Sequence, residues 1–254
     1  MNPKLVSIEL TNLCQKGNLC KSFGCYAKSD PEGATFWTPN VLEYFVRDLA
    51  HNGIEAVSFG GGEPLQYEGL WDFLGMIKNV PIFKSMTTNG LLLGIRTEER
   101  LARHLDKVHV SIHFPENDWE VKRVIRSVKD LERRGLKSGI NFIVKGWDMK
   151  KEKEAVRQIR NEGITPDRVV FLPLRGKGIH VDQGKFKEVA GILSEKFQST
   201  WCLLECKKSD RFISVNWEGY VGWCSYTDSK TRMTDFTYAG MMEALGEKEL
   251  SYCG

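Results

Sequence analysis

The chain has 254 residues, of which 41% are hydrophobic and 27% are charged, and its formal net charge is +3. This composition is typical of a globular protein, and so small a net charge does not favour binding to nucleic acid. No apolar run approaches the roughly 20 residues of a membrane span, and the N-terminal residues lack the apolar segment of a signal peptide. We therefore expect a cytoplasmic protein with neither a nucleic-acid partner nor a membrane partner.

The first predicted element is a β-rich strand at 4–10, and the polar segment behind it carries Cys14, Cys20 and Cys25 within twelve residues. Without an export signal, an odd total of seven cysteines favours metal ligands over disulfides. A zinc site or a four-thiolate cluster would use a fourth ligand, and no further cysteine occurs before Cys202. Three local thiolates therefore favour a four-iron cluster with one open iron. The alternative, cysteines buried as small hydrophobic residues, poorly explains a polar loop that contains glycine.

The chain then alternates predicted helices and strands. Thr38 is a predicted N-cap with Pro39 at the first helical position, and Asn52 and Gly53 end that helix. The strands are expected at 4–10, 55–59, 83–87, 107–113, 138–144 and 168–172, and the helices at 39–51, 70–78, 98–105, 119–134 and 151–162. Six strands with a helix between each pair predict an α/β fold with a parallel sheet.

Six such repeats fit a partial TIM-like barrel, and the pattern alone would equally allow an open doubly wound sheet. In either fold, ligands bind at the carboxyl ends of the strands. The segments that end the predicted strands are the cysteine segment, Gly60 to Pro64, Asn89, His113, Lys145 and Arg175. We expect the functional site at this edge.

The stretch Ser58-Phe-Gly-Gly-Gly-Glu-Pro-Leu65 follows the second predicted strand. A glycine triplet alone is usually a tight turn. Together with the three-cysteine segment, it resembles the radical S-adenosylmethionine (SAM) superfamily. That family usually spaces its cysteines by three and two residues, with an aromatic residue before the third, whereas here the spacings are five and four and Gly24 separates Phe23 from Cys25.

The resemblance implies a partial (β/α)6 TIM-like barrel over residues 1–180, with SAM and a 4Fe–4S cluster held by the three cysteines. It also implies that side-chain-free backbone admits the methionine ammonium group, whose charge Glu63 takes, and that Ser111 and Arg123 bind the carboxylate. Arg123 has the alternative of an ordinary solvated arginine, because its helix is rich in basic residues. The full predicted cofactor set is Gly60, Gly61, Gly62, Glu63, Pro64, Asn89, Ser111, Arg123, Asn141 and Leu172.

Two members of this site have more specific predictions. Asn141 lies in the middle of a predicted strand and is expected to bind the ribose of SAM. His113 lies where many relatives have aspartate, so it is the candidate catalytic residue facing the substrate. The alternative for His113 is a histidine that only satisfies a hydrogen bond in the core.

Behind the barrel, residues 181–199 are expected to form one amphipathic linker helix, and residues 200–254 to form a small cysteine-rich extension. The apolar positions of the helix are Phe186, Val189, Ile192, Leu193 and Phe197. Residues 212–223 read as a β-hairpin with Glu218 and Gly219 in its turn.

The spacing from Cys206 through Gly219 to Cys224 resembles the SPASM extension and its shorter relative, the twitch domain. The resemblance implies an auxiliary 4Fe–4S cluster bound by Cys206, Cys224 and Cys253, with Cys202 as a further candidate ligand. A structural zinc ion is the alternative for these four thiols.

The resemblance implies an enzyme that reductively cleaves SAM to a 5′-deoxyadenosyl radical, which takes a hydrogen atom from a small-molecule or peptide substrate for oxidation or crosslinking. An electron donor such as flavodoxin or ferredoxin would serve it. One alternative is an activating enzyme for glycyl-radical enzymes, which acts on a protein partner. The other is a non-enzymatic iron–sulfur or zinc protein, which leaves Gly60 to Pro64 unexplained.

Overall fold

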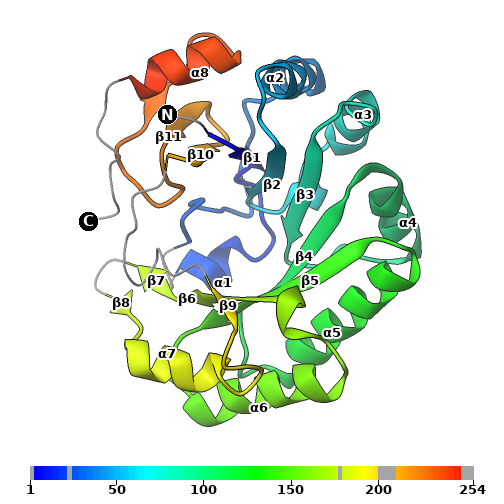
Figure 1. Cartoon of the computed structure of the whole chain (residues 1–254), viewed down its shortest axis with the longest axis vertical. Helices are drawn as coiled ribbons and strands as arrows, with labels where there is room; N and C mark the ends of the chain where they lie inside the picture. The colour runs from blue at the N-terminus through cyan, green and yellow to red at the C-terminus, as the bar shows by residue number, and fades with distance from the viewer. Residues whose placement is uncertain (1–2, 22–24, 177–178, 200–209, 247–254) are drawn as a thin grey trace. The chain divides into compact units, whose positions relative to one another are not determined.

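The computed structural model describes residues 3–21, 25–176, 179–199 and 210–246. The chain divides into two compact units. The first unit comprises Met1–Met86, His104–Asp106 and Lys208–Gly254, and the second comprises Thr87–Arg103 and Lys107–Lys207. Figure 1 labels most of their helices and strands.

The first unit contains a mostly parallel sheet in the order β12-β11-β10-β1-β2-β3. Its strands are β1 (Leu5–Thr11), β2 (Ala56–Gly61), β3 (Phe83–Thr88), β10 (Phe212–Val215), β11 (Tyr220–Gly222) and β12 (Thr231–Arg232). β10, β1, β2 and β3 run parallel, while β11 and β12 add antiparallel strands at one edge. The helices are α1 (Gly17–Lys21), α2 (Pro39–His51), the short 3₁₀ helix η1 (Pro64–Gln66), α3 (Leu70–Met76) and α8 (Tyr238–Leu245).

The second unit contains the parallel strands β4 (Lys107–Ile112), β5 (Lys137–Val144), β6 (Val169–Pro173) and β9 (Gln198–Ser199), in that order. A separate antiparallel pair is formed by β7 (Arg175–Gly176) and β8 (Ile179–His180). The helices are α4 (Ile95–His104), α5 (Asp118–Arg133), α6 (Met149–Asn161), η2 (Pro166–Arg168) and α7 (Gln183–Ala190). α5 packs against β4 and β5 (Figure 1).

Local sequence explains why α2 begins where it does. The Thr38 hydroxyl accepts a hydrogen bond from the Val41 backbone N–H, and Pro39 occupies the first turn, where its missing N–H costs nothing. The helix then buries Leu42, Phe45, Val46 and Leu49 along one face. Full burial of such side chains stabilises the fold by about 1.5–3 kcal/mol each.

The central strands of each unit have one apolar and one polar face. In β1, Val6, Ile8 and Leu10 are fully buried, while Ser7 and Glu9 occupy the opposite face. The strand register aligns one row of serines across four strands, Ser214, Ser7, Ser58 and Ser85. A polar row inside a sheet does not serve an apolar core, so this face of the first unit is the one that suits a binding site.

The structure confirms the α/β class and all six predicted strands, each within two residues at either end. It also confirms the hairpin over residues 212–223, with Gly219 at a positive φ in its turn. β10 of this hairpin pairs with β1 inside the first unit. The closure of the strands into a partial barrel and the domain boundaries at 180 and 200 stay predictions.

The linker helix predicted over 181–199 is wrong beyond Ala190. α7 ends there at Gly191, and the chain turns into the short strand β9. The Phe197 ring packs on Phe171 and Phe186 from this extended segment, at centroid distances of 5.9 Å in both cases. Its apolar character reflects this packing on two aromatic rings rather than a place on a helical face.

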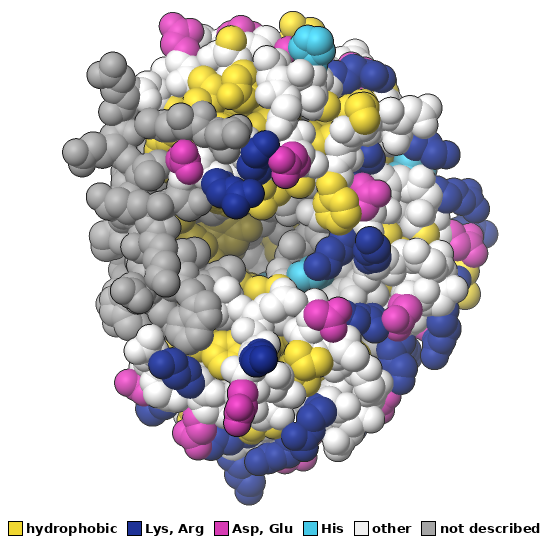
Figure 2. Space-filling view, in the orientation of Figure 1, with side chains coloured by type: hydrophobic (Ala, Val, Ile, Leu, Met, Phe, Trp, Pro, Cys, Tyr) yellow, Lys and Arg dark blue, Asp and Glu magenta, His cyan; other side chains and the backbone are white. Residues whose placement is uncertain are grey.

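Charges on the visible face are mixed. Figure 2 shows acidic side chains interspersed among the basic ones, in keeping with a net charge of only +3. Within the described part of the chain, no helix has the length and apolar character needed to cross a membrane.

Candidate functional site

The cysteine segment of the first unit begins directly at the end of β1. Cys14 is buried, with 7% of its surface exposed, and its backbone N–H donates to the Asp30 carbonyl at 2.8 Å. Cys20 lies in α1 and is half-buried. The half-buried Cys25 thiol lies 3.3 Å from the Ser29 hydroxyl. The sequence therefore places the three thiols on one segment anchored at its first cysteine.

Hydrogen bonds close the base of this segment. The Asn12 backbone N–H donates to the Ala34 carbonyl at 3.1 Å, and the Ala34 N–H donates to Asn12 Oδ1 at 2.7 Å. The Thr11 hydroxyl also donates to the Ala34 carbonyl, at 2.8 Å. Residues 12–34 thus leave and return to the end of β1 at one point, which fixes where the cysteine segment is presented.

The glycine turn packs backbone to backbone against the start of this segment. The Gly62 N–H donates to the Thr11 carbonyl at 2.6 Å, and the Glu63 N–H donates to the Leu13 carbonyl at 2.7 Å. A Cβ on Gly61 would overlap the Thr11 carbonyl, and one on Gly62 would overlap the Leu13 carbonyl. Two of the three glycines are therefore required by the contact with the cysteine segment.

Substitution of these glycines provides a steric test. Gly62→Ala should lower the free energy of unfolding by about 1–3 kcal/mol, because the new methyl group meets backbone that cannot rotate away. Gly60→Ala is the matched control, since a Cβ there would lie 3.6 Å from the Tyr26 hydroxyl, at ordinary contact distance. Urea unfolding followed by circular dichroism measures both. Equal midpoints for the two variants would contradict the proposed packing.

Two buried carboxylates of the first unit lie near this turn in sequence or register. Glu63 is fully buried, and its Oε1 accepts a hydrogen bond from the Leu65 N–H at 3.1 Å. Glu9, paired in register with Gly60, is 2% exposed. Burial raises the pKa of Glu9 to about 7, although the Lys230 charge and the Trp217 backbone N–H oppose the shift.

Sequence analysis missed Glu9. A signal was present, because an acid stands among the apolar residues of Leu5-Val-Ser-Ile-Glu-Leu10. Within the described residues, Glu9 Oε1 is buried without a hydrogen-bond partner. Buried polar atoms without partners are uncommon, so the Glu9 carboxylate on the polar face is a further candidate functional group.

In the second unit, Arg123 of α5 lies against Asn89. Its Nη2 donates to the Asn89 carbonyl at 2.9 Å, and its guanidinium lies 5.3 Å from the centre of the Trp119 ring. The neighbouring Lys122 and Arg126 are exposed on the same helix. The structure therefore brings Arg123 and Asn89 together and distinguishes Arg123 from the solvated basic residues of α5.

Ser111 and Asn141 are register partners on adjacent strands of the second unit. In β5 and β6, Ile143 pairs with Leu172 two residues further toward the carboxyl ends. Because Asn141 and Ile143 are two apart in one strand, they share a face of the sheet. Three predicted cofactor residues, Ser111, Asn141 and Leu172, thus belong to one face of β4, β5 and β6.

His113 follows β4 and is held by α5. The Glu120 carboxylate accepts the His113 backbone N–H at 2.6 Å, and the same oxygen lies 3.9 Å from Nδ1 of the ring. A similar acid, Glu152 of α6, accepts the Gly146 N–H at 2.9 Å behind β5. Each helix thus anchors the loop that precedes it. The catalytic role of His113 stays a prediction.

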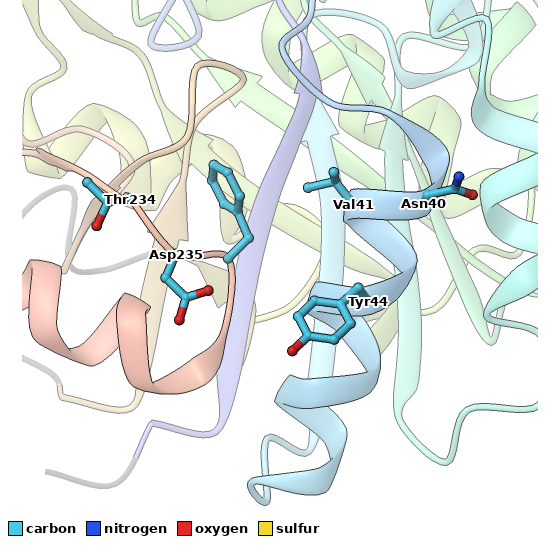
Figure 3. A pocket seen from close by; sticks show the side chains of 6 residues that line it. Asn40, Val41, Tyr44, Thr234 and Asp235 are labelled. Carbon is cyan, nitrogen blue, oxygen red and sulfur yellow. The ribbon is translucent and has the colours of Figure 1, made fainter.

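A pocket of about 320 Å³ lies in the first unit between α2 and the segment before α8 (Figure 3). Its lining residues are Asn40, Val41, Tyr44, Thr234, Asp235 and Phe236. None of them belongs to the predicted site, and we assign this pocket no role.

Comparison with known proteins identifies the family. A model of the radical SAM superfamily matches residues 8–180, which is more than half of the chain. The chain belongs to the radical SAM superfamily.

Two curated relatives of this radical SAM protein are a GTP 3′,8-cyclase and a probable GTP 3′,8-cyclase. This chain is 32% identical over 178 residues to a GTP 3′,8-cyclase of Aquifex aeolicus, and the match covers 64% of this chain and 54% of the relative. It is 34% identical over 139 residues to a probable GTP 3′,8-cyclase of Thermococcus kodakarensis, covering 55% of this chain and 44% of the relative. The chain thus spans about half the length of these relatives.

Solved structures share the fold. SuiB of Streptococcus suis bound to its precursor peptide SuiA matches with a TM-score of 0.71 and 18% identity, over 98% of this chain and 64% of SuiB. The protein anSMEcpe with bound AdoMet matches with a TM-score of 0.66 and 15% identity, over 94% of this chain and 77% of that one. At these identities the likeness concerns the fold alone.

The family implies a cluster and SAM, and the donors of this radical SAM protein fit the cluster, because thiolates are the usual iron–sulfur ligands. In the described residues, no group of three or more His, Cys, Asp or Glu side chains has the arrangement of a metal-ion site, so the ligand set stays a prediction. Cys224 follows β11, and its sulfur accepts the Tyr226 N–H at 3.4 Å. Cys202, Cys206 and Cys253 lie outside the described residues.

Proposed function

We propose that this protein is a radical SAM enzyme that cleaves SAM reductively and uses the 5′-deoxyadenosyl radical to take a hydrogen atom from a small-molecule or peptide substrate. The observation that carries this proposal is the packing of the glycine turn on the cysteine segment, in a chain of this superfamily. The two motifs that the chemistry needs are thus joined by backbone hydrogen bonds in one unit.

Cys14, Cys20 and Cys25 are the proposed ligands of a 4Fe–4S cluster. When bound, the reduced cluster supplies the electron that breaks the carbon–sulfur bond to C5′ of SAM. The chain contributes the anchored segment that presents the thiols, because the base at Asn12 and Ala34 is fixed by three hydrogen bonds. That anchoring supports a cluster held at one place relative to β1 and β2.

The remaining proposed contacts concern SAM. We assign the ammonium group to the glycine turn, Gly60 to Pro64 with the buried Glu63, and the carboxylate to Ser111 and Arg123. The guanidinium of Arg123 forms one hydrogen bond with Asn89 and stacks on Trp119, so its position is set before any ligand binds. Asn141 is proposed to contact the ribose, and Leu172, which shares its face of the sheet, to belong to the same cofactor site.

The C-terminal residues are proposed to form a twitch-like extension. The hairpin of β10 and β11 leads directly to Cys224, which supports an auxiliary cluster there with Cys206, Cys253 and the candidate ligand Cys202. This cluster would accept the electron that an oxidised substrate loses. We further propose residues 1–180 as the partial barrel, a cytoplasmic location, and a flavodoxin or ferredoxin as electron donor.

The substrate class rests on two comparisons. The curated relatives are named GTP 3′,8-cyclases, which indicates a small molecule. SuiB is described in complex with a precursor peptide, which indicates a peptide. We therefore keep both classes in the proposed function.

Anaerobic reconstitution tests this function. With two clusters we expect about eight irons per chain, and dithionite plus SAM should yield 5′-deoxyadenosine detectable by mass spectrometry. A sample without dithionite is the control, because the cleavage consumes one electron per SAM. Failure of the iron-loaded protein to form 5′-deoxyadenosine would contradict the proposed enzyme function. Zinc in the C-terminal group would contradict only the twitch assignment.

A further inference from the structure

His109 lies in the middle of β4, on the polar face that also carries Ser111. The flanking Val108 and Val110 are fully buried on the other face. Its register partner on β5 is Gly139, and a Cβ there would lie 2.7 Å from His109 Nε2. The absence of a side chain at Gly139 lets the imidazole lie across β5, toward the residue two positions further along.

That residue is Asn141. His109 Nδ1 and Asn141 Oδ1 are 2.8 Å apart, a hydrogen-bond distance. Burial lowers the pKa of His109 to about 4, and the bond to Asn141 offsets only part of this shift. The imidazole is therefore neutral at physiological pH, so only one of its two nitrogens carries a proton.

The geometry selects which nitrogen carries that proton. Nε2 of His109 is buried and has no hydrogen-bond partner among the described residues. A proton on Nε2 would leave a buried donor unsatisfied, and Nδ1 would then face the Asn141 oxygen with no hydrogen between two acceptors. A proton on Nδ1 instead donates to Oδ1. The Nδ1–H form is thus the favoured tautomer.

This bond fixes the orientation of the Asn141 amide. Its oxygen accepts from His109, while its nitrogen donates to the Thr87 hydroxyl over a long 3.4 Å. An amide nitrogen has two hydrogens, so Asn141 retains donor capacity on the polar face. A reversed amide would turn its nitrogen toward Nδ1, which would require the proton to be on Nε2 and would leave that buried N–H without a partner. Asn141 is therefore held as a hydrogen-bond donor.

We propose that His109 is a positioning residue that holds the Asn141 amide with its N–H groups toward an oxygen acceptor of SAM, of which the ribose hydroxyls are the chemical class that fits. This role rests on the proposed function, because it requires SAM to bind along the polar face of β4 and β5. It adds to that function a residue that makes no direct contact with the cofactor.

The test compares two variants of nearly the same shape. His109→Asn places an amide nitrogen near the position of Nδ1 and retains a donor, whereas His109→Leu has the same branching and no donor. Both variants lose the imidazole ring, so the vacated volume should lower the stability of both proteins by a similar amount. Thermal unfolding measures this loss of stability. We expect His109→Leu to weaken SAM binding about tenfold, as loss of one hydrogen bond does, and His109→Asn to bind within about threefold of wild type.

A double-mutant cycle with Asn141→Ala separates positioning from a general structural effect. If His109 acts through Asn141, the double variant His109→Leu/Asn141→Ala should bind SAM no more weakly than Asn141→Ala alone. Additive losses would overturn the proposal, and so would equal affinities of His109→Leu and His109→Asn. Wild-type affinity in Asn141→Ala would overturn it while leaving the enzyme function intact. A wild-type protein that binds no SAM would overturn both.

A measurement on the unmutated chain covers the case in which the variants do not fold. Nitrogen chemical shifts of ¹⁵N-histidine-labelled protein distinguish the two neutral tautomers of the ring. The chain has five histidines, and sequential assignment of the uniformly ¹³C,¹⁵N-labelled unmutated chain identifies the signal of His109. We expect His109 to carry its proton on Nδ1 and to remain neutral down to about pH 5, because the pKa is lowered. A proton on Nε2 would overturn the proposal.

Discussion

Replacement of Cys14, Cys20 and Cys25 by alanine is expected to abolish formation of 5′-deoxyadenosine. This loss of activity is larger than the loss expected from removing a single hydrogen bond. The proposed C5′–S cleavage needs an electron from a cluster on this segment, and no other cysteine lies between β1 and β2. The variant should retain about four irons of an expected eight, bound by the C-terminal group. Iron analysis and mass spectrometry of the dithionite-driven reaction measure both quantities.

The matched comparison is the Cys206→Ala/Cys224→Ala variant. It should also retain about four irons, yet still form 5′-deoxyadenosine without substrate, because its remaining cluster would be the one that we propose to cleave SAM. Cys14 is buried, so circular dichroism must show that each variant is folded, and the Cys206/Cys224 variant must also retain SAM binding. Equal loss of 5′-deoxyadenosine in both folded variants would contradict the division of roles. Substrate turnover by the Cys206/Cys224 variant would favour the activating-enzyme alternative.

Strand positions could be predicted from the sequence because each central strand is a short apolar or alternating run between turn residues. Helix ends were less predictable. The apolar spacing of Phe186, Val189 and Phe197 suits a helix, yet Gly191 ends α7 and Phe197 packs from an extended segment. Helix α1 has only five residues, too few for a periodic signal.

The two motifs of the candidate site could be read from the sequence, because each is contiguous. The packing of the two motifs against each other could not be read from the sequence. The sequence interpretation explained the glycines by SAM alone, and the structure adds that Gly61 and Gly62 are required by the carbonyls of Thr11 and Leu13. That contact depends on the register of β1 and β2, in which Thr11 pairs with Gly61. Register is a tertiary property that no local pattern contains.

The same limit explains why the sequence interpretation missed His109 and left two alternatives for Arg123. The proposed role of His109 depends on its neighbours Gly139 and Asn141 on the next strand. Arg123 could be separated from Lys122 and Arg126 only by the phase of α5, which turns one basic residue toward Asn89 and two toward water. Polar residues on alternating strand positions are the sequence signal, and strand pairing decides which of them act together.

Glu9→Gln is expected to raise the free energy of unfolding by about 3 kcal/mol at pH 8 and to change it little at pH 4.5. Burial raises the pKa of Glu9 from 4.5 to about 7 in the folded protein. Between these two values the folded state holds a proton that the unfolded state has released, so stability falls as pH rises and levels off above about 7. Glutamine cannot ionise, so the variant does not lose this stability as the pH rises.

Urea unfolding of protein without reconstituted clusters, at pH 4.5, 6 and 8, measures the effect. Burial also raises the pKa of Glu152 to about 7, but this group is present in both proteins and cancels in the difference. The control is Glu154→Gln, which removes one acidic charge from an exposed position of α6 and should leave the pH dependence unchanged. A gain from Glu9→Gln that is equal at pH 4.5 and pH 8 would show that packing, rather than ionisation of a buried carboxyl, determines its effect. No gain at pH 8 would mean that the folded protein stabilises the Glu9 carboxylate.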